Sequence, residues 1–256
     1  MPSTEKYTAE TITELHTWTP SLFSFKTTRD KGYRFVSGQF ARLGIKNGDE
    51  MVWRAYSIAS AHYDEYLEFY SIVVPNGKFT SQLSKLSVGD KIYIERKSLG
   101  FLTTDRFELG KDLWMLATGT GLAPFISILY DFRTWEHYEN LILVHSVRIE
   151  DELAYREVIH NFKHSEYFAG FSSRLHYVQA VTRETVPNTL NARITDLIEN
   201  GELERTVGFP IDDERSRVMI CGNPEMVDET RALLTKRGLT VSRRGAPGHL
   251  AVENYW

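Results

Sequence analysis

The sequence contains a single cysteine, Cys221, among 256 residues. An intramolecular disulfide is therefore impossible, and an iron–sulfur cluster held by several cysteines is excluded as well. No apolar run approaches the roughly 20 residues that a helix needs to cross a bilayer. The first residues also lack the charged-then-apolar pattern of a secretory signal. These absences predict a reducing, cytoplasmic location and no membrane partner.

A strong excess of positive charge is absent too. The formal net charge is -4. Residues 1–104 hold 13 Lys and Arg against 11 Asp and Glu, and the remainder holds 17 against 23. Nucleic-acid binders normally show a basic stripe, so no nucleic-acid partner is expected. The eight histidines are scattered without metal-ligand spacing, so no metal site is expected. The mildly basic first part suits an acidic protein partner.

Short apolar-alternating segments fill the first part of the chain, with turn residues such as Asn76-Gly77 between them. Many short strands at close spacing predict a closed antiparallel barrel. A short helix is expected over residues 81–86, with Thr80 as its N-cap. The predicted strands include residues 22–27, 33–36, 67–74 and 91–95.

After about residue 111 the sequence pattern changes, and predicted strands alternate with predicted helices. This alternation predicts an α/β domain with a mostly parallel sheet. Ligands of such sheets bind at the carboxyl ends of the strands. We therefore expect an antiparallel barrel over residues 1–105 and an α/β domain over residues 106–256. The predicted strands are 113–117, 140–146, 174–181 and 217–222, and the predicted helices are 125–138, 151–163, 192–200 and 224–237.

The central motif is a glycine turn, Thr118-Gly119-Thr120-Gly121, between the first of these strands and the helix that follows it. Glycine permits positive φ and close approach of a ligand to the backbone, and the start of a helix suits a phosphate. The turn departs from the GxGxxG fingerprint, because Ala123 and Pro124 follow it. A phosphate-binding turn and a plain tight connection are both open on this pattern alone.

Arg54 and Tyr56 lie two residues apart on a predicted barrel strand, so they share one face. Arginine pairs with phosphate, a tyrosine ring stacks on flat rings, and the Ser57 hydroxyl adds one hydrogen bond. An ordinary surface strand is the alternative. The turn over residues 76–81 leads into a short helix. The N-terminus of this helix either binds an anion or is an ordinary capped turn without a ligand.

A second strand–turn–helix unit begins at Cys221-Gly222-Asn223-Pro224. A cysteine at that strand end faces the ligand edge or is a small buried hydrophobe. Arg183 and Arg193 follow the third predicted strand, where they are either ligand contacts or solvated surface charges. The chain ends on two aromatic residues, which favours docking of the tail over exposure.

These motifs occur in one order along essentially the whole chain, and as an ordered set they resemble the bacterial branch of the ferredoxin/flavodoxin–NADP(+) reductase family. The resemblance rests on Arg54-Ala55-Tyr56-Ser57, Gly77-Lys78-Phe79-Thr80-Ser81, Gly119-Thr120-Gly121-Leu122-Ala123-Pro124-Phe125, Cys221-Gly222-Asn223-Pro224 and the aromatic C-terminus.

The resemblance implies FAD on the barrel and NADP(H) on the α/β domain. Arg54 would hold the FAD pyrophosphate, Tyr56 would stack on the isoalloxazine, and Ser57 would bond near its N5. Tyr255 would cover the other flavin face, and Trp256 would pack on the adenine. The further FAD residues implied are Ala55, Tyr70, Ser71, Ile72, Val73, Lys78, Phe79, Thr80 and Thr120.

The same resemblance places NADP(H) against residues after three strands of the α/β domain, with Cys221 near the nicotinamide. Together with Ser57, Glu253 and Tyr255, Cys221 would surround the reacting rings as a catalytic residue. The NADP(H) residues implied are Val147, Arg148, Thr182, Arg183, Arg193, Asn223, Pro224, Glu225 and Met226.

The implied activity is electron transfer between NADP(H) and a one-electron carrier, ferredoxin or flavodoxin, by a monomeric FAD enzyme. Docking of that carrier would be transient and electrostatically steered. Two alternatives stay open: an NADH-dependent flavin reductase, and the reductase component of an oxygenase system. A module that keeps only the fold, without catalysis, is a third.

Overall fold

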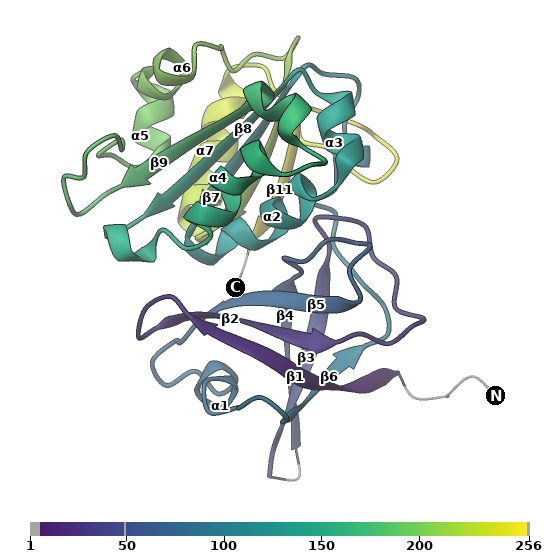
Figure 1. Cartoon of the computed structure of the whole chain (residues 1–256). Helices are drawn as coiled ribbons and strands as arrows, with labels where there is room; N and C mark the ends of the chain where they lie inside the picture. Colours follow the sequence, from purple (N-terminus) through teal and green to yellow (C-terminus); the bar gives the residue numbers. More distant parts are fainter. Residues whose placement is uncertain (1–5, 49, 255–256) are drawn as a thin grey trace.

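The computed structural model describes residues 6–48 and 50–254, which form two modules stacked one above the other (Figure 1). The first module is a curled, six-stranded antiparallel sheet in the order β4-β3-β6-β1-β2-β5. An isolated bridge between Ile58 and Phe69 brings its two ends together. Its elements are β1 (Tyr7–Thr17), β2 (Leu22–Thr28), β3 (Phe40–Asn47), β4 (Glu50–Ser57), β5 (Tyr66–Ile72), α1 (Thr80–Leu83) and β6 (Lys91–Glu95).

Side chains along the paired strands β2 and β5 point alternately to the two faces of this sheet, so it has an inner and an outer face. Phe25 and Phe69 are opposite each other in register and lie in the core of the first module. Leu22 and Tyr70, on the other face, belong to the core that the two modules share. The period of two along a strand therefore produces one face for the barrel and one for the second module.

The second module is a five-stranded parallel sheet in the order β11-β10-β7-β8-β9. Helices cover both of its faces (Figure 1), so its central strands are buried on both sides and read as apolar runs. The strands are β7 (Asp112–Thr118), β8 (Asn140–Val147), β9 (Leu175–Val181), β10 (Ser216–Gly222) and β11 (Leu250–Asn254); the helices are α2 (Ala123–Leu129), α3 (Phe132–His137), α4 (Arg156–Asn161), α5 (Ile194–Glu199), α6 (Glu202–Val207) and α7 (Pro224–Lys236).

Short 3-10 turns join several of these elements: η1 (Thr104–Arg106), η2 (Gly119–Leu122), η3 (Glu150–Glu152), η4 (Phe162–His164) and η5 (Ala169–Arg174). The predicted boundary between residues 105 and 106 falls within η1 and stays a prediction. Among the described residues, no helix is long and apolar enough to span a membrane.

Two local predictions for the first module are wrong. Residues 33–36 form no strand, although Tyr33 and Phe35 are still buried in the core. The Arg29 guanidinium bonds the Tyr33 carbonyl instead, so a side chain replaces a strand partner. Thr80 is the first residue of α1 rather than its N-cap, because its hydroxyl accepts the backbone N–H of Val74.

In the second module, the predicted helices 125–138 and 151–163 are both interrupted. Asp131 starts a separate helix, α3, by accepting the backbone N–H of Arg133. Tyr155 adopts a left-handed conformation (φ 60°) and stands immediately before α4. The sequence pattern also misses α6 and the edge strand β11.

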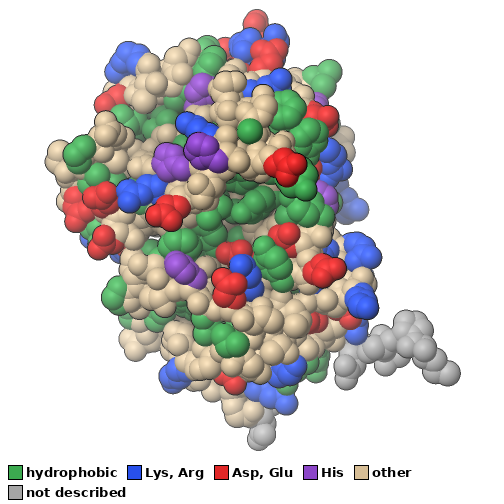
Figure 2. All heavy atoms as spheres, in the orientation of Figure 1, with side chains coloured by type: hydrophobic (Ala, Val, Ile, Leu, Met, Phe, Trp, Pro, Cys, Tyr) green, Lys and Arg blue, Asp and Glu red, His purple; other side chains and the backbone are tan. Residues whose placement is uncertain are grey.

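The two modules share one continuous apolar core, which includes residues from β2, β5, β7, α2 and β10. The buried Ser127 hydroxyl donates to the Ser60 carbonyl (2.8 Å) across the boundary, and the Tyr63 phenol donates to the Tyr130 carbonyl (3.2 Å). Figure 2 shows hydrophobic side chains gathered along this seam, with acidic and basic side chains interspersed over the rest of the face. The modules are therefore packed against each other directly.

Candidate functional site

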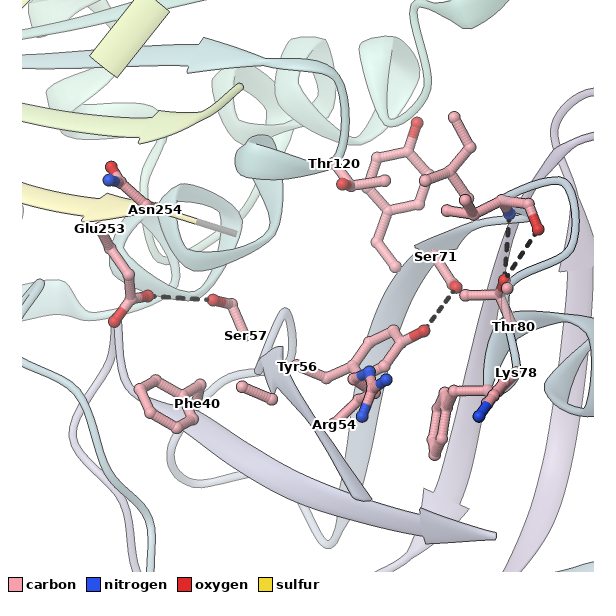
Figure 3. A pocket seen from close by; sticks show the side chains of 16 residues that line it. Phe40, Arg54, Tyr56, Ser57, Ser71, Lys78, Thr80, Thr120, Glu253 and Asn254 are labelled. Carbon is pink, nitrogen blue, oxygen red and sulfur yellow. Dashed lines mark hydrogen bonds between the residues drawn. The ribbon is translucent and has the colours of Figure 1, made fainter. Parts of the chain in front are cut away.

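A cavity of about 580 Å³ opens at the seam, mainly in the first module. Its walls combine a tyrosine ring, two exposed cations and several hydroxyl groups, and Figure 3 shows these side chains pointing into it. We call it the first cavity. It is lined by Phe40, Arg54, Ala55, Tyr56, Ser57, Tyr70, Ser71, Ile72, Val74, Gly77, Lys78, Phe79, Thr80, Thr120, Glu253 and Asn254.

Strand β4 presents Arg54 and Tyr56 to the first cavity side by side (Figure 3). The Tyr56 phenol is 3.0 Å from the Ser71 hydroxyl, and burial raises the pKa of Tyr56 to about 12. The ring is therefore neutral at pH 7 and fixed at its tip. The Arg54 guanidinium is exposed and donates to the neighbouring Trp53 carbonyl (2.8 Å), and Lys78 is exposed on α1's side of the cavity. Two cations and a fixed flat ring suit a ligand with both phosphate and aromatic parts.

Glu253 of β11 reaches the first cavity from the second module. The Ser57 hydroxyl donates to its carboxylate (Ser57 Oγ to Glu253 Oε2, 3.3 Å; Figure 3). Burial raises the pKa of Glu253 to about 7, although the hydrogen bond from Ser57 acts in the opposite direction. At neutral pH this carboxyl is thus able both to hold and to release a proton beside the cavity.

A second cavity, of about 480 Å³, lies at the carboxyl ends of the parallel strands. The first module contributes one of its walls. It is lined by Leu22, Ile72, Val73, Val74, Pro75, Thr118, Gly119, Thr120, Ser146, Val147, Arg148, Glu152, Thr182, Arg183, Arg193, Ile194, Gly222, Asn223, Glu225 and Met226. This is the edge at which an open α/β sheet is expected to bind its ligand.

Three arginines line the second cavity, and their partners differ. Arg148 is paired with Glu152 (2.6 Å), and Arg193 is paired with Glu229 (2.6 Å). Although burial alone would raise it, hydrogen bonds from Arg148 lower the pKa of Glu152 below its ordinary value. Arg183 is exposed, and within residues 6–48 and 50–254 its guanidinium forms no ion pair, unlike those of Arg148 and Arg193. Its guanidinium is the cation most available to an anionic ligand.

Two glycine turns interlock at the base of the second cavity. A Cβ on Gly121 would lie 2.5 Å from the carbonyl carbon of Cys221, so the turn after β7 rests directly on the end of β10. Gly222 has a φ of +136°, and a Cβ there would overlap Thr118. By contrast, a Cβ on Gly119 would meet nothing within 4 Å. One glycine is required for packing, and another leaves room for a ligand.

This contrast makes the Gly121→Ala variant informative. We expect it to lower the free energy of unfolding by about 2–4 kcal/mol, since the new methyl group collides with backbone rather than with a flexible side chain. The corresponding drop in Tm is roughly 5–15 °C. Thermal unfolding of the purified protein measures it. The control Gly119→Ala meets only the left-handed backbone cost of about 1–2 kcal/mol. Equal losses in the two variants would contradict the interlocked packing.

The structure brings together most of the residues that the resemblance implied. All of the implied FAD residues among those described line the first cavity, except Val73, which lines the second. All of the implied NADP(H) residues line the second cavity except Pro224. Cys221 is fully buried in the shared core and lines neither cavity. Tyr255 and Trp256 lie outside the described residues.

Several lining residues were missed by the sequence reasoning. Phe40 and Asn254 enter the first cavity, and Glu152 and Ile194 enter the second. Phe40 begins β3 outside every motif considered above, whereas Asn254 ends β11 within the C-terminal tail but was assigned no role. Ser146 also lines the second cavity, as expected of the residue that ends the predicted parallel strand 140–146.

The donor groups of the two cavities fit a dinucleotide in each. The first offers two cations for a pyrophosphate, a neutral tyrosine ring for a flat heterocycle, and hydroxyls for a polar edge. The second offers open space at Gly119 for a close backbone approach, and arginines for a further phosphate. These are the groups that FAD and a phosphorylated nicotinamide dinucleotide require.

Comparison with known proteins supports this interpretation. The model of the oxidoreductase FAD-binding domain matches residues 11–99, and that of the oxidoreductase NAD-binding domain matches residues 115–232. A ferredoxin–NADP reductase of Pseudomonas aeruginosa is 45% identical over 248 residues, which cover 95% of each chain. The chain belongs to the ferredoxin/flavodoxin–NADP(+) reductase family.

Two further members of this reductase family are similar over nearly the whole chain. A flavodoxin/ferredoxin–NADP reductase of Escherichia coli is 38% identical over 246 residues, covering 96% of this chain and 97% of the relative. The crystal structure of a ferredoxin NADP+ reductase from Neisseria gonorrhoeae with bound FAD and NADP superposes with a TM-score of 0.91. It is 36% identical, and the match covers 98% of this chain and all of the other.

The matches confirm three predictions: the reductase family, the order of an antiparallel FAD domain and a parallel-sheet nicotinamide domain, and an FAD-dependent oxidoreductase. Identification of the single residues with their roles stays a prediction. So do the roles of Tyr255 and Trp256.

Proposed function

We propose that this reductase transfers electrons between NADP(H) in the second cavity and a ferredoxin or flavodoxin, with FAD in the first cavity. FAD, when bound, accepts two electrons at once and releases them one at a time, which a nicotinamide does not do. The relatives' names support both partners, since they are ferredoxin– or flavodoxin/ferredoxin–NADP reductases. A cytoplasmic location and a monomeric state remain predictions.

The observation that carries this proposal is that the two cavities share a wall. Ile72, Val74 and Thr120 line both of them. Ligands that fill both cavities would therefore lie next to each other at these three residues. Direct transfer of a hydride needs such contact, because the reacting atoms must approach to about 3–3.5 Å in the right orientation.

The residues of the first cavity divide into three tasks. Arg54 and Lys78 neutralise the FAD phosphates, and Tyr56 stacks on the flat ring. Ser71 fixes the Tyr56 phenol, so the ring keeps its orientation. Ser57 and Glu253 form a hydrogen-bonded pair at one end of the cavity and hold a proton near the reacting edge.

In the second cavity, Arg148, Arg183 and Arg193 would hold the 2′-phosphate of NADP(H). Asn223 holds the turn after β10 by accepting the N–H groups of Glu225 and Met226. Cys221 supports that turn from within the core. Its place in the shared core makes it a packing residue.

The experiment that tests this function uses the purified flavoprotein under anaerobic conditions. NADPH is expected to bleach the flavin absorbance, and ferredoxin or flavodoxin from the same organism is expected to restore it. A flavoprotein that NADPH does not bleach would contradict the proposed reaction. Bleaching by NADPH without reoxidation by either carrier would contradict the proposed acceptor.

An exposed surface beside the first cavity suits the docking of an acidic carrier. Val36, Leu99 and Phe101 are 44%, 42% and 60% exposed. Gly100, between two of them, approaches Phe40 and Glu253 of the cavity wall. The Arg106 guanidinium lies 4.5 Å from the centre of the Phe101 ring, so positive charge flanks the apolar patch. An apolar patch beside positive charge suits a small, transient interface with an acidic electron carrier.

Electrostatic docking of this kind weakens with salt. We expect the rate of carrier reduction to fall several-fold between about 0.05 M and 0.5 M salt, because the Debye length shrinks from roughly 14 Å to 4 Å. Stopped-flow reduction of ferredoxin or flavodoxin measures this rate. Reduction of a small uncharged quinone serves as the control and should change little. A salt-independent rate with the protein carrier would contradict the docking surface.

A further inference from the structure

Tyr155 belongs to the second module, yet its side chain is buried against the first. Only 3% of the residue is exposed. Its phenol donates a hydrogen bond of 2.7 Å to Oε1 of Glu68 on β5. Its ring packs on Trp18 (4.9 Å between ring centres) and edge-on against Tyr70 (5.4 Å). A single side chain thus joins the α/β module to the outer face of the barrel sheet.

The backbone of Tyr155 is set for this contact. Its φ of 60° and ψ of 6° are left-handed, a conformation that residues other than glycine, asparagine and aspartate seldom adopt. This conformation interrupts the helical segment before α4. The direction of the Tyr155 side chain is therefore not fixed by the helical periodicity of α4. The buried ring and its hydrogen bond supply the contacts that hold it there.

The contact of Tyr155 with the barrel sheet is next to the second cavity, at the neighbouring cross-strand residue pair of the same face. On the outer face of β2 and β5, Ser24 is opposite Tyr70, and Leu22 is opposite Ile72. Tyr155 contacts the first pair through the Tyr70 ring. The second pair lines the second cavity. Glu152, three residues before Tyr155 in the sequence, lines the same cavity.

We propose that Tyr155 is a positioning residue that sets the width of the second cavity between the two modules, and through it the approach of the nicotinamide to the flavin. This inference rests on the proposed function. The first module supplies the wall at Leu22 and Ile72, and the second module supplies the opposite wall at Thr118 to Thr120. The distance between these walls depends on how the modules are joined, and the phenol of Tyr155 joins them next to the cavity.

The test compares Tyr155→Phe, which loses the hydrogen bond, with Tyr155→Ala, which also loses the ring. We expect NADPH to reduce the bound flavin more slowly in both, by at least about fivefold in Tyr155→Ala, since small misplacements of reacting groups are costly. NADP(+) should bind more weakly by calorimetry. The affinity for 2′-phospho-AMP, which needs only the arginines of the second module, should be unchanged.

Tyr63→Phe is the matched control, because it too removes a phenol hydrogen bond between the modules, but one that lies away from both cavities. It is expected to reduce Tm without slowing flavin reduction. Glu68→Gln keeps an oxygen acceptor and should remain near the wild type, whereas Glu68→Leu should reproduce Tyr155→Phe. These two variants keep the proposal testable if Tyr155→Ala does not fold.

Wild-type reduction rates in Tyr155→Phe and Glu68→Leu would overturn the positioning role. So would a loss of 2′-phospho-AMP affinity that parallels the loss of NADP(+) affinity, because that would place the effect within one module. Failure of NADPH to reduce the unmodified flavoprotein is a different result, and it would overturn the proposed function instead.

Discussion

Replacing Arg54 with alanine is expected to weaken FAD binding by roughly 10- to 150-fold. This range corresponds to the loss of one charge-assisted phosphate contact, about 1.5–3 kcal/mol. Arg54 lines the first cavity with an exposed guanidinium, whose hydrogen bond in the structure goes to the adjacent Trp53 carbonyl. Its other N–H groups are therefore available to donate hydrogen bonds to a pyrophosphate. FAD release during dialysis, followed by flavin fluorescence, measures the change.

Arg42 provides the matched control for this variant. It lies on β3, opposite Ala55 in register, but it does not line the cavity, and its guanidinium is paired with Glu95 at 2.8 Å. Arg42→Ala should retain FAD like the wild type. Arg54→Lys should recover only part of the affinity, since an ammonium group does not make the bidentate contact of a guanidinium. Unchanged FAD retention in Arg54→Ala would refute the assignment.

Much of this site could be predicted from the sequence because its motifs are local. Arg54 and Tyr56 share a face by the period of a strand, and the residues after parallel strands gather at one sheet edge by topology. Both arguments need only the type of element and the order of elements. The structure places these residues in the two cavities accordingly.

Features that depend on contacts between distant segments could not be predicted. Strand β11 is only five residues long and follows a loop rich in glycine, and its parallel pairing with β10 is what makes it a strand. Cys221 is the last residue but one of a strand buried on both faces, where the sequence does not say which side chains point into the core. The break at Tyr155 likewise follows from contacts with the first module.

The preference for NADPH over NADH is expected to be at least about tenfold in kcat/KM, or roughly 1.4 kcal/mol. An NAD site usually holds an acidic residue at the end of the second strand for the ribose 2′-hydroxyl. Here Glu150 pairs with Arg156, and neither Glu150 nor Asp151 lines the second cavity. Glu152 does line it, but Arg148 holds that carboxylate with three hydrogen bonds from its side chain.

The arginines supply the opposite preference. The acidic neighbour of Arg183, Glu184, directs its carboxylate to the backbone N–H of Glu150 (2.8 Å), so it does not neutralise the guanidinium through that contact. Replacing Arg183 and Arg193 together with alanine should therefore remove most of the discrimination by harming NADPH use and sparing NADH use. Steady-state kinetics with both cofactors measures this. Arg231→Ala, an exposed arginine of α7 outside the cavity, is the control.

The single variants should rank in a definite order. Arg193 is already bound to Glu229, so a 2′-phosphate must compete with that carboxylate before it gains the contact. Arg183→Ala is therefore expected to lose more discrimination than Arg193→Ala, and Glu229→Gln is expected to improve NADPH use by freeing Arg193. The reverse order would mean that Arg193 leaves its partner at little cost. Equal turnover of NADPH and NADH by the unmodified protein would overturn the assignment and favour an NADH-dependent reductase.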